Sequence, residues 1–298
     1  MNPPHISVCI CTYRRPDLLE RSLNAVRELE TAGVLTYSVV VADNDENESG
    51  RPVVDAFARS CAIPITYCVE PVQNIALARN CALRVATGEY VAFMDDDEFP
   101  VPAWLRRMLE VCNLYGAAGV QGPVRPHFDT QPPRWLERGG FCERPEHPTG
   151  FKVPWEGGRT GNVLFRRSIL NDVREPFRAE FGTMAEDQDF FRRLNEKGHT
   201  FVWCNEGVIY EVVPPARWTR SFLLKRALLR GQMSLRHPVG RLGKIARSLV
   251  AVPCYAFGLP FFLVAGQHVF MRYLVSLCDH LGRLLALVHL NPVRKRGH

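Results

Sequence analysis

The sequence predicts an α/β protein with a mostly parallel sheet, followed by a basic and apolar C-terminal region. Over the first two thirds of the chain, short apolar runs rich in β-branched and aromatic residues alternate with amphipathic segments of helical length. This alternation is typical of a parallel sheet covered by helices on both faces. Beyond Pro215 the acidic residues nearly disappear. We therefore expect one α/β domain at 1–212 and a separate region at 213–298.

The strands and helices of the α/β domain are expected in a regular order. Buried apolar runs predict strands at 6–11, 37–42, 65–69, 90–94, 118–120, 201–203 and 208–212. Apolar residues at helical spacing predict helices at 16–29, 53–61, 74–86, 103–114 and 186–197. The segment 125–155 is rich in Pro, Arg and Glu and has weak periodicity, which is typical of a functional lid or a mobile loop.

The cysteines and the N-terminus indicate the compartment. The ten cysteines are scattered without a metal-binding spacing, and several lie in apolar runs, so we expect reduced thiols and no zinc site. The first residues contain no basic segment followed by an apolar stretch, and therefore do not resemble a signal peptide. Both observations favour the cytoplasm.

Three adjacent carboxylates, Asp95, Asp96 and Asp97, come directly after the predicted strand 90–94. Adjacent acids repel one another unless a cation offsets them, and Mg²⁺ or Mn²⁺ prefers oxygen ligands that it shares with a nucleotide's phosphates. The carboxyl ends of the strands are also where open α/β sheets bind ligands. The alternative is a solvated acidic turn that caps the helix beginning near Pro102.

Polar residues also follow two other predicted strands. Thr12, Tyr13 and Arg14 come after the first strand, and Asp43 and Asn44 come after the second. Because the carboxyl ends of parallel strands converge at one crevice, these groups suit a nucleotide diphosphate with a metal ion. The alternative is that each residue caps the helix that follows it.

Two further candidates lie on predicted helices. Arg79 falls in a stretch of small apolar residues, where a buried guanidinium needs an anionic partner, either a ligand or an acid of the domain. Glu186 and Asp187 begin the helix 186–197, where the helix dipole favours carboxylates in any case. A carboxylate held there could also act as a general base toward an acceptor hydroxyl.

Taken together, these motifs resemble the family 2 glycosyltransferases of the GT-A fold. The resemblance covers about residues 5 to 212, and it is the order and spacing of the set that make it specific. It is carried by Thr12-Tyr13-Arg14-Arg15, Asp43-Asn44, Ala78-Arg79-Asn80, the run from Gly88 to Asp97, and Glu186-Asp187.

The resemblance implies roles at the nucleotide and at the metal. Asp43 would read the nucleotide base. The nucleotide and its diphosphate would be surrounded by Thr12, Tyr13, Arg14 and Arg79. In the D-x-D motif, Asp97 would ligate Mg²⁺ or Mn²⁺ together with Asp95, and Asp95 or Asp96 would contact the ribose or the waters of the metal.

The resemblance also implies roles on the acceptor side. Asp187, with Glu186 beside it, would be the catalytic base of an inverting transfer. Gly161 and Asn162 would border the donor sugar or the acceptor. Two departures stand out. A late metal-binding His of many GT-A enzymes is replaced by Tyr210-Glu211. Arg217-Trp218 resembles a motif of processive polysaccharide synthases but lacks the preceding Gln, which favours transfer of a single sugar.

The C-terminal region predicts contact with a membrane. From Val212 to Cys278 there is no Asp or Glu, whereas ten Lys and Arg residues, among them Arg236, lie in this stretch, and Arg294-Lys295-Arg296 close the sequence. The run Leu249–Gly266 carries no charge, but its prolines and glycine favour a broken or re-entrant hairpin over a simple span. The basic flanks suit a hairpin with both ends in the cytoplasm, or an anchor that lies in the plane of an anionic membrane surface. The alternative is the core of a helical subdomain.

The sequence therefore predicts an inverting, metal-dependent glycosyltransferase. It would move one sugar from a nucleotide-sugar, with UDP favoured, to a lipid-linked saccharide or another membrane-borne acceptor at the cytoplasmic face of the inner membrane. The C-terminal pattern resembles bacterial exopolysaccharide transferases of the succinoglycan type.

Three rival functions fit less well. A sugar nucleotidyltransferase would need a Gly-rich phosphate loop after the first strand, and 11–16 contains no Gly. A non-catalytic binding or assembly partner stays open, although the complete set of acids disfavours it. A nucleic-acid-binding protein would explain the basic residues but not the acidic sheet edge.

Overall fold

The structure is a computed structural model that describes residues 3–182, 185–235, 240–288 and 290. Two groups of basic residues named above, Arg236 and Arg294–Arg296, lie outside the described residues. The chain divides into two compact units. The first consists of 1–126 and 144–212, and the second of 127–143 and 213–298, so a segment from the middle of the chain joins the C-terminal helices.

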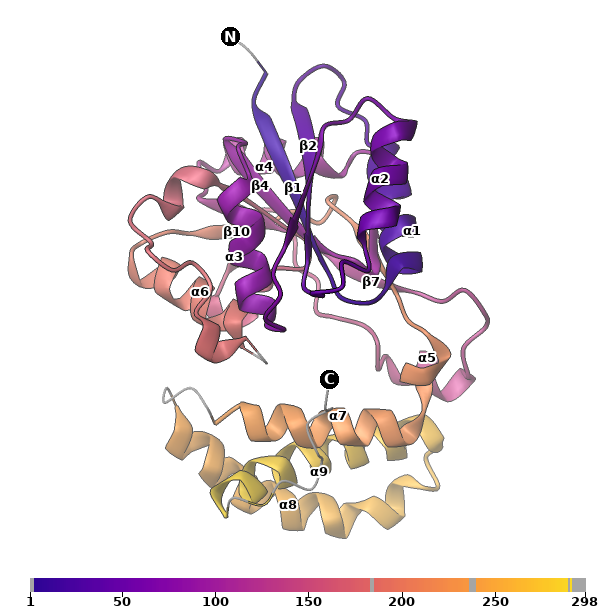
Figure 1. Ribbon diagram of the computed structural model, residues 1–298. Coiled ribbons are helices and arrows are strands. Elements are labelled where there is room, and N and C mark those ends of the chain that lie inside the picture. Colours follow the sequence, from indigo (N-terminus) through magenta and orange to yellow (C-terminus); the bar gives the residue numbers. More distant parts are fainter. Residues whose placement is uncertain (1–2, 183–184, 236–239, 289, 291–298) are drawn as a thin grey trace. The chain divides into compact units, whose positions relative to one another are not determined.

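The first unit is built around a mixed eight-stranded sheet with the order β3-β2-β1-β4-β9-β6-β10-β8 (Figure 1). β3, β2, β1 and β4 run parallel, as do β6 and β10, whereas β9 runs antiparallel between β4 and β6, and β8 antiparallel to β10. The bounds are β1 His5–Thr12, β2 Thr36–Asp43, β3 Ile65–Val69, β4 Tyr90–Asp95, β6 Gly119–Gln121, β8 Lys152–Val153, β9 Val163–Arg166 and β10 Phe201–Trp203.

Helices cover both faces of this sheet because alternate side chains of each strand are apolar on both faces. Ile6, Val8 and Ile10 of β1 pack with α1, α2 and α4, whereas Cys9 and Cys11 pack with α3 and α6 on the other face (Figure 1). The bounds are α1 Pro16–Arg27, α2 Arg51–Ser60, α3 Ile75–Val85, α4 Trp104–Leu114 and α6 Glu186–Glu196. The predicted parallel α/β sheet is therefore confirmed.

A second, three-stranded sheet has the order β5-β11-β7, and its strand β5 directly follows the acidic triplet. Its strands are β5 Glu98–Pro100, β7 Val124–His127 and β11 Ile209–Val212. β5 pairs antiparallel with β11, and this register sets Glu98 opposite Glu211. The small sheet therefore holds the residues that follow the triplet in a fixed position.

The second unit consists of helices α5 Arg134–Gly139, α7 Arg220–Met233, α8 Arg241–Phe262 and α9 Gln267–Leu287. Val213 N donates to His127 O at 2.9 Å, and Arg272 Nε donates to Gly139 O at 2.8 Å, so both of its chain segments are tied together. α8 continues through Pro253 and Pro260, so the prolines do not break it. The break predicted within Leu249–Gly266 lies after them, because α8 ends at Phe262 and α9 begins at Gln267. Each proline removes only one backbone donor, and packing against α9 supports α8 along its length.

Candidate active site

The acidic triplet follows β4 and meets the end of the neighbouring strand β1. Thr12 Oγ1 donates to Asp96 Oδ2 at 2.8 Å. Arg15 Nη1 donates to Asp97 Oδ2 at 3.0 Å, and Arg15 Nη2 lies 3.0 Å from Asp96 Oδ1. Ser22 Oγ donates to the carbonyl of Asp96 at 2.8 Å. The last two acids of the triplet are therefore bound to the protein itself, and Arg15 rather than Arg14 contacts them.

Asp95 is the most open acid of the triplet, with 44 % of its side chain exposed. Desolvation in its recess raises its pKa to about 6, Asp97 and Asp187 add to the shift, and Arg79 opposes it. Asp96 is fully buried, and burial raises its pKa to about 7 although Arg15 favours its charged form. Burial therefore disfavours the charged forms of both carboxyl groups, and the neighbouring arginines only partly offset this.

Arg79 of α3 connects the triplet with the start of α6. Its guanidinium donates to Glu186 and, at 2.8 Å, to Asp187 Oδ1, and lies 3.8 Å from Asp95. The side chain is almost completely buried, and although burial lowers the pKa of Arg79, the acids raise it overall. The sequence predicted that either a ligand or an acid of the domain pairs with this arginine. The structure shows pairing with acids of the domain.

Asp187 is held from two sides at the beginning of α6. Besides Arg79, Thr160 Oγ1 donates to Asp187 Oδ1 at 2.7 Å, while 24 % of the Asp187 side chain stays exposed. Glu186 is buried, and burial together with Asp187 raises the pKa of Glu186 against the effect of Arg79. An exposed carboxylate in a fixed position has the geometry that a general base requires. Thr160 was not predicted, although it lies next to Gly161.

Asp43 at the end of β2 is fully buried and stabilises the loop that follows it. Its carboxylate accepts hydrogen bonds from Tyr67 Oη at 2.7 Å and from the backbone N–H groups of Gly50 and Asp45 at 2.6 Å and 3.0 Å. Arg14, at a φ of 52°, donates to Asp45 Oδ1 at 3.2 Å, and its guanidinium lies 5.0 Å from the ring centre of Tyr13. In this structure Asp43 faces the loop, so its base-reading role stays a prediction.

A fourth carboxylate, which directly follows the triplet, was not predicted. Glu98 is 1 % exposed; its Oε2 accepts from Asp95 N at 2.8 Å, and its Oε1 has no hydrogen-bond partner among the described residues. Burial and Asp95 raise the pKa of Glu98 well above its usual range. A Cβ atom on Gly161 would lie 2.8 Å from Glu98 Oε1 and 3.4 Å from Asp95 Oδ2, so this glycine allows the loop to approach both acids.

Glu211, the residue at the expected place of a metal-binding His, is engaged in an ion pair. It bonds with Arg144 on the segment that precedes β8. Since Glu211 lies opposite Glu98 across the small sheet, Arg144 offsets two carboxylates on neighbouring strands. The carboxylate at the place of the expected His is therefore paired with an arginine.

The site contains oxygen ligands, but the protein alone does not complete a metal site. Within the part of the chain that the structure describes, no group of three or more His, Cys, Asp or Glu side chains is arranged to hold a metal ion. Mg²⁺ characteristically uses one or two carboxylates and completes its shell with water and substrate phosphates. The partly exposed carboxylate of Asp95 and the nearby Asp97 would hold such a shared cation. Glu98 Oε1, which has no hydrogen-bond partner among the described residues, is a further oxygen of the same kind.

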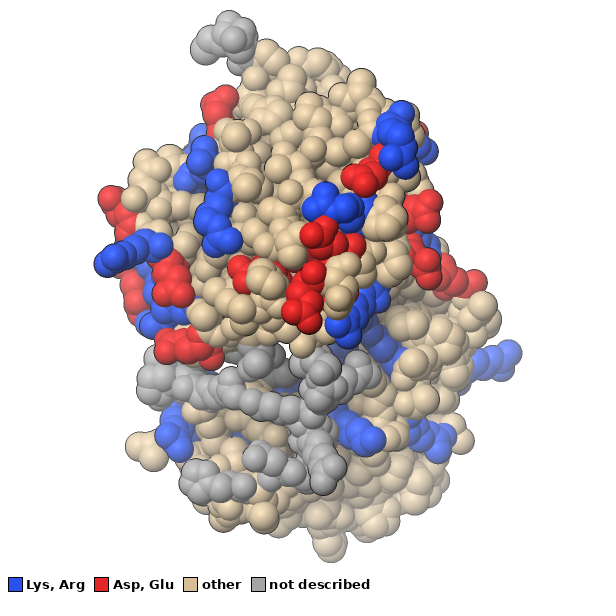
Figure 2. Space-filling model, in the orientation of Figure 1, with Lys and Arg blue, Asp and Glu red and all other residues tan. Residues whose placement is uncertain are grey.

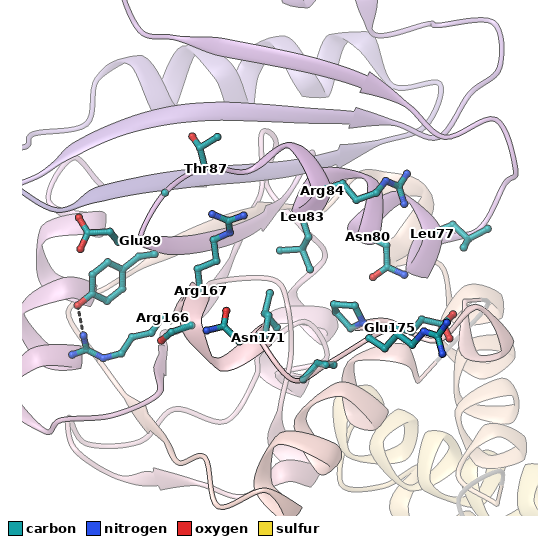
Figure 3. A pocket seen from close by; sticks show the side chains of 17 residues that line it. Leu77, Asn80, Leu83, Arg84, Thr87, Glu89, Arg166, Arg167, Asn171 and Glu175 are labelled. Atoms are coloured by element: carbon teal, nitrogen blue, oxygen red, sulfur yellow. Dashed lines mark hydrogen bonds between the residues drawn. The ribbon is translucent and has the colours of Figure 1, made fainter.

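A hollow of about 940 Å³ lies at the other end of β4. Figure 3 shows it between the beginning of β4 and the segment 166–176, with Arg84 and Arg167 among its side chains. The acidic triplet follows the opposite end of the same strand. This hollow is therefore separate from the candidate active site.

Comparison with known proteins decides the family. The family model described as glycosyl transferase family 2 matches residues 7–174. The chain is also 38 % identical over 231 residues to the succinoglycan biosynthesis protein ExoM of Rhizobium meliloti, which covers 76 % of this chain and 73 % of ExoM. The chain belongs to glycosyltransferase family 2. It is an enzyme of the glycosyltransferase class, as the sequence predicts.

Solved structures show that this glycosyltransferase has the GT-A fold. The mannosyltransferase PcManGT from Pyrobaculum calidifontis, solved with GDP-Man and Mn²⁺, aligns with a TM-score of 0.65 at 18 % identity, over 97 % of this chain and 88 % of PcManGT. S. aureus TarS 1–349, solved with UDP-GlcNAc, aligns with a TM-score of 0.56 at 16 % identity, over 76 % of this chain and 66 % of TarS 1–349. E. coli chondroitin synthase shares 28 % identity over 44 % of this chain but only 19 % of its own length.

The residues that the sequence assigns to the acceptor side of this glycosyltransferase lie in different surroundings. Gly161 lies beside Asp95, but Asn162 is fully buried; it accepts from Trp104 Nε1 at 2.8 Å and donates to two backbone carbonyls. Its side chain is thus not available to a ligand in this structure. Arg217 and Trp218 belong to the second unit, where Trp218 Nε1 donates to Val213 O at 3.0 Å. Their acceptor role stays a prediction.

Proposed function

We propose that this enzyme transfers a single sugar from a nucleotide-sugar to a hydroxyl group of an acceptor, with inversion at the anomeric carbon. The observation that supports this most strongly is the meeting of three groups in one place. Arg79 of α3 lies 3.8 Å from Asp95 of the acidic triplet and 2.8 Å from the partly exposed carboxylate of Asp187. ExoM, which is similar to this chain, is named for succinoglycan biosynthesis. We extend that context, exopolysaccharide synthesis, to this enzyme.

The residues would divide the reaction between them. Asp187 would take the proton of the acceptor hydroxyl while that oxygen attacks the anomeric carbon, and Thr160 would hold its carboxylate in place. Attack from the side opposite the departing nucleotide inverts the configuration. Asp95 and Asp97 would hold Mg²⁺ or Mn²⁺. When bound, this ion offsets charge on the departing diphosphate. PcManGT was solved with Mn²⁺ and GDP-Man, whereas TarS was solved with UDP-GlcNAc, and we favour a UDP-sugar here.

A small cavity next to the site supports a saccharide acceptor. It measures about 140 Å³ and includes Gly161, Arg159 and Arg144 in its wall. His147 stacks on Phe151 with ring centres 4.1 Å apart, and Trp203 packs edge-on against His147. Aromatic faces with a few polar groups match a sugar ring, which has apolar C–H faces and polar hydroxyls. We propose that the acceptor saccharide is lipid-linked or otherwise membrane-borne, at the cytoplasmic face of the membrane.

Asp97→Asn tests the proposal, because it removes one charged oxygen ligand but keeps the shape of the side chain. Nucleotide binding is measured by thermal shift with UDP and GDP, each with Mn²⁺ or with chelator. We expect Mn²⁺ to strengthen binding to the natural protein and to have little effect on the variant, which should not turn over donor. Asp55→Asn, on the exposed side of α2, is the matched control. Wild-type turnover of Asp97→Asn in excess chelator would disprove the metal-assisted mechanism.

A further inference from the structure

Helix α8 presents an apolar surface that no described residue covers. Only Ser248 of its residues is buried. We call the following side chains, which recur at helical spacing, the outer face of α8: Leu249, Val250, Phe257 and Phe261, continued by Val264 after the helix. Phe257 is 78 % exposed and Val264 is 92 % exposed. Soluble monomers rarely expose a continuous apolar patch of this kind, so the outer face indicates a binding surface.

The opposite face of α8 is fixed to α9. Ser248 Oγ lies 3.0 Å from His280 Nδ1, and the rings of Phe262 and Tyr273 stack with centres 3.5 Å apart. α9 also packs closely against α7, where Gly282 contacts the backbone of Leu228 so tightly that a Cβ atom would lie 2.2 Å from its carbonyl oxygen. α9 therefore lies between α7 and α8 (Figure 1).

The basic residues of this unit are concentrated on α7 and at the beginning of α8. α7 carries exposed basic residues along its length, namely Arg220, Lys225, Arg226 and Arg230. Arg230 donates to Asp279 of α9, which is the only acidic residue of 213–298. On α8 the basic residues Arg241, Lys244 and Arg247 occupy only the first turns. On its visible side, Figure 2 shows a broad area of uncharged residues in this unit, with a few Lys and Arg along one edge.

One helix in the described part of the chain, Arg241–Phe262, is long and apolar enough to cross a membrane by length and composition. Its packing argues against a crossing. The uncharged part of α8 has about 15 residues and spans about 22 Å, less than the hydrocarbon core of about 30 Å. α9 would have to return through the bilayer with Arg272, Asp279 and Arg283, and it would carry the basic helix α7 with it. Such charges in the hydrocarbon are costly.

From this arrangement we infer that α8 lies in the plane of one membrane leaflet and inserts its outer face among the lipid chains. The basic first turns would bind anionic headgroups, while α9 separates α8 from the basic helix α7. The occupant is an anionic bilayer surface, because the apolar face is continued by a purely basic segment, and a second copy of this face would bring like charges together. The inference deepens the proposed membrane-borne acceptor, but its test needs neither donor nor acceptor.

The first experiment measures flotation of the full-length protein with vesicles of phosphatidylcholine containing about 30 % phosphatidylglycerol, or none. We expect binding to the anionic vesicles, only partly reversed by high salt because apolar contacts are not screened. The double variant Phe257→Ser, Phe261→Ser should have a vesicle partition coefficient lower by about tenfold or more. Leu114→Ser, which removes a 76 % exposed leucine from α4, should leave it unchanged. Unchanged flotation of the double variant would overturn the inference.

The second experiment distinguishes an in-plane helix from a crossing helix. Single cysteines replace Leu249, Phe257 or Val264 in a Cys254→Ser background, and a fluorescent thiol label reports its depth by quenching from lipids labelled at known depths. The signal of the Cys254→Ser background, which keeps other partly exposed thiols, is subtracted. An in-plane helix places all three labels within about 5 Å in depth, whereas a crossing helix separates the first and last by about 20 Å.

A graded depth of that size would refute the in-plane arrangement. A third outcome would assign the outer face to association between copies of the chain. In that case the protein is a dimer without lipid, the double variant is a monomer, and neither protein floats with vesicles.

Discussion

Arg79→Gln tests whether the buried arginine orients the general base or binds the diphosphate of the donor. The side chain of Arg79 is 7 % exposed and contacts Glu186 and Asp187 directly. Glutamine keeps much of the length of the side chain but removes its charge. Two neighbouring carboxylates then lose their common partner, and Asp187 is left with the hydrogen bond from Thr160.

The structure gives the expected size of the effect on stability. Removal of one partner from a buried ion pair costs about 3–5 kcal/mol. For a unit of this size, each 1 kcal/mol shifts the melting temperature by about 2–4 °C, so we expect a loss of roughly 6–20 °C. Arg84→Gln, on the same helix but 62 % exposed and 3.7 Å from Glu70, is the matched control and should change stability by less than about 0.5 kcal/mol.

The catalytic effect separates the two roles. If Arg79 positions Asp187, kcat should fall by about 10²-fold or more while the dissociation constant for the nucleotide diphosphate changes little. Arg79→Lys should restore stability better than kcat, because an ammonium group cannot contact both acids as the guanidinium fork does. Arg79→Gln with Glu186→Gln restores charge balance and should recover stability without recovering kcat. A variant with intact kcat and tenfold weaker binding of the diphosphate would refute this reasoning and place Arg79 at the donor.

Two further predictions concern the acids. Asp187→Asn should reduce kcat by about 10²- to 10⁴-fold with nearly unchanged donor affinity, and Glu186→Gln should have a milder effect. Steady-state kinetics and nucleotide titration measure both quantities, and a fall in donor affinity alone would place Asp187 in the nucleotide site instead. The raised pKa values of Asp95, about 6, and Asp96, about 7, mean that the folded state binds protons more tightly than the unfolded state. In chelator, their stabilising effect is present below about pH 4 and is lost as the pH rises through 6 to 7. Denaturant midpoints should therefore fall from pH 5 to 8, less steeply in Asp96→Asn, and a midpoint that rises over this range would contradict the assignment.

The strands and their polar ends could be predicted because each signal is local. The apolar runs that precede Thr12, Asp43 and Asp95 match β1, β2 and β4, and the parallel order of these strands brings their carboxyl ends together. β9 was not predicted as a strand. It is only four residues long and lies between parallel strands in the opposite direction, so its position depends on pairing with β4 and β6 rather than on its own sequence.

The direction of a side chain was harder to predict than its place in the chain. Asp43 and Asn162 occur where the motif analysis expects them, yet the structure buries both and satisfies their side chains with hydrogen bonds from the protein. Conversely, Arg15 and Thr160 contact the acids although the sequence assigned them no role. A motif specifies which residues follow a strand, but which of them turns toward the site depends on loops that are distant in the sequence.

The sequence by itself determined the family, the parallel α/β sheet and the concentration of acids after β4, because these depend on local periodicity and on the order of short motifs. The tertiary structure decided which partners those acids have. Arg79 is 107 residues away from Glu186, and Thr160 is 27 residues away from Asp187. The structure also decided that, among the described residues, α8 keeps an uncovered apolar face, because α9 covers only one side of it. Charge and hydropathy can be read along a chain, whereas pairing and exposure arise only when distant segments pack together.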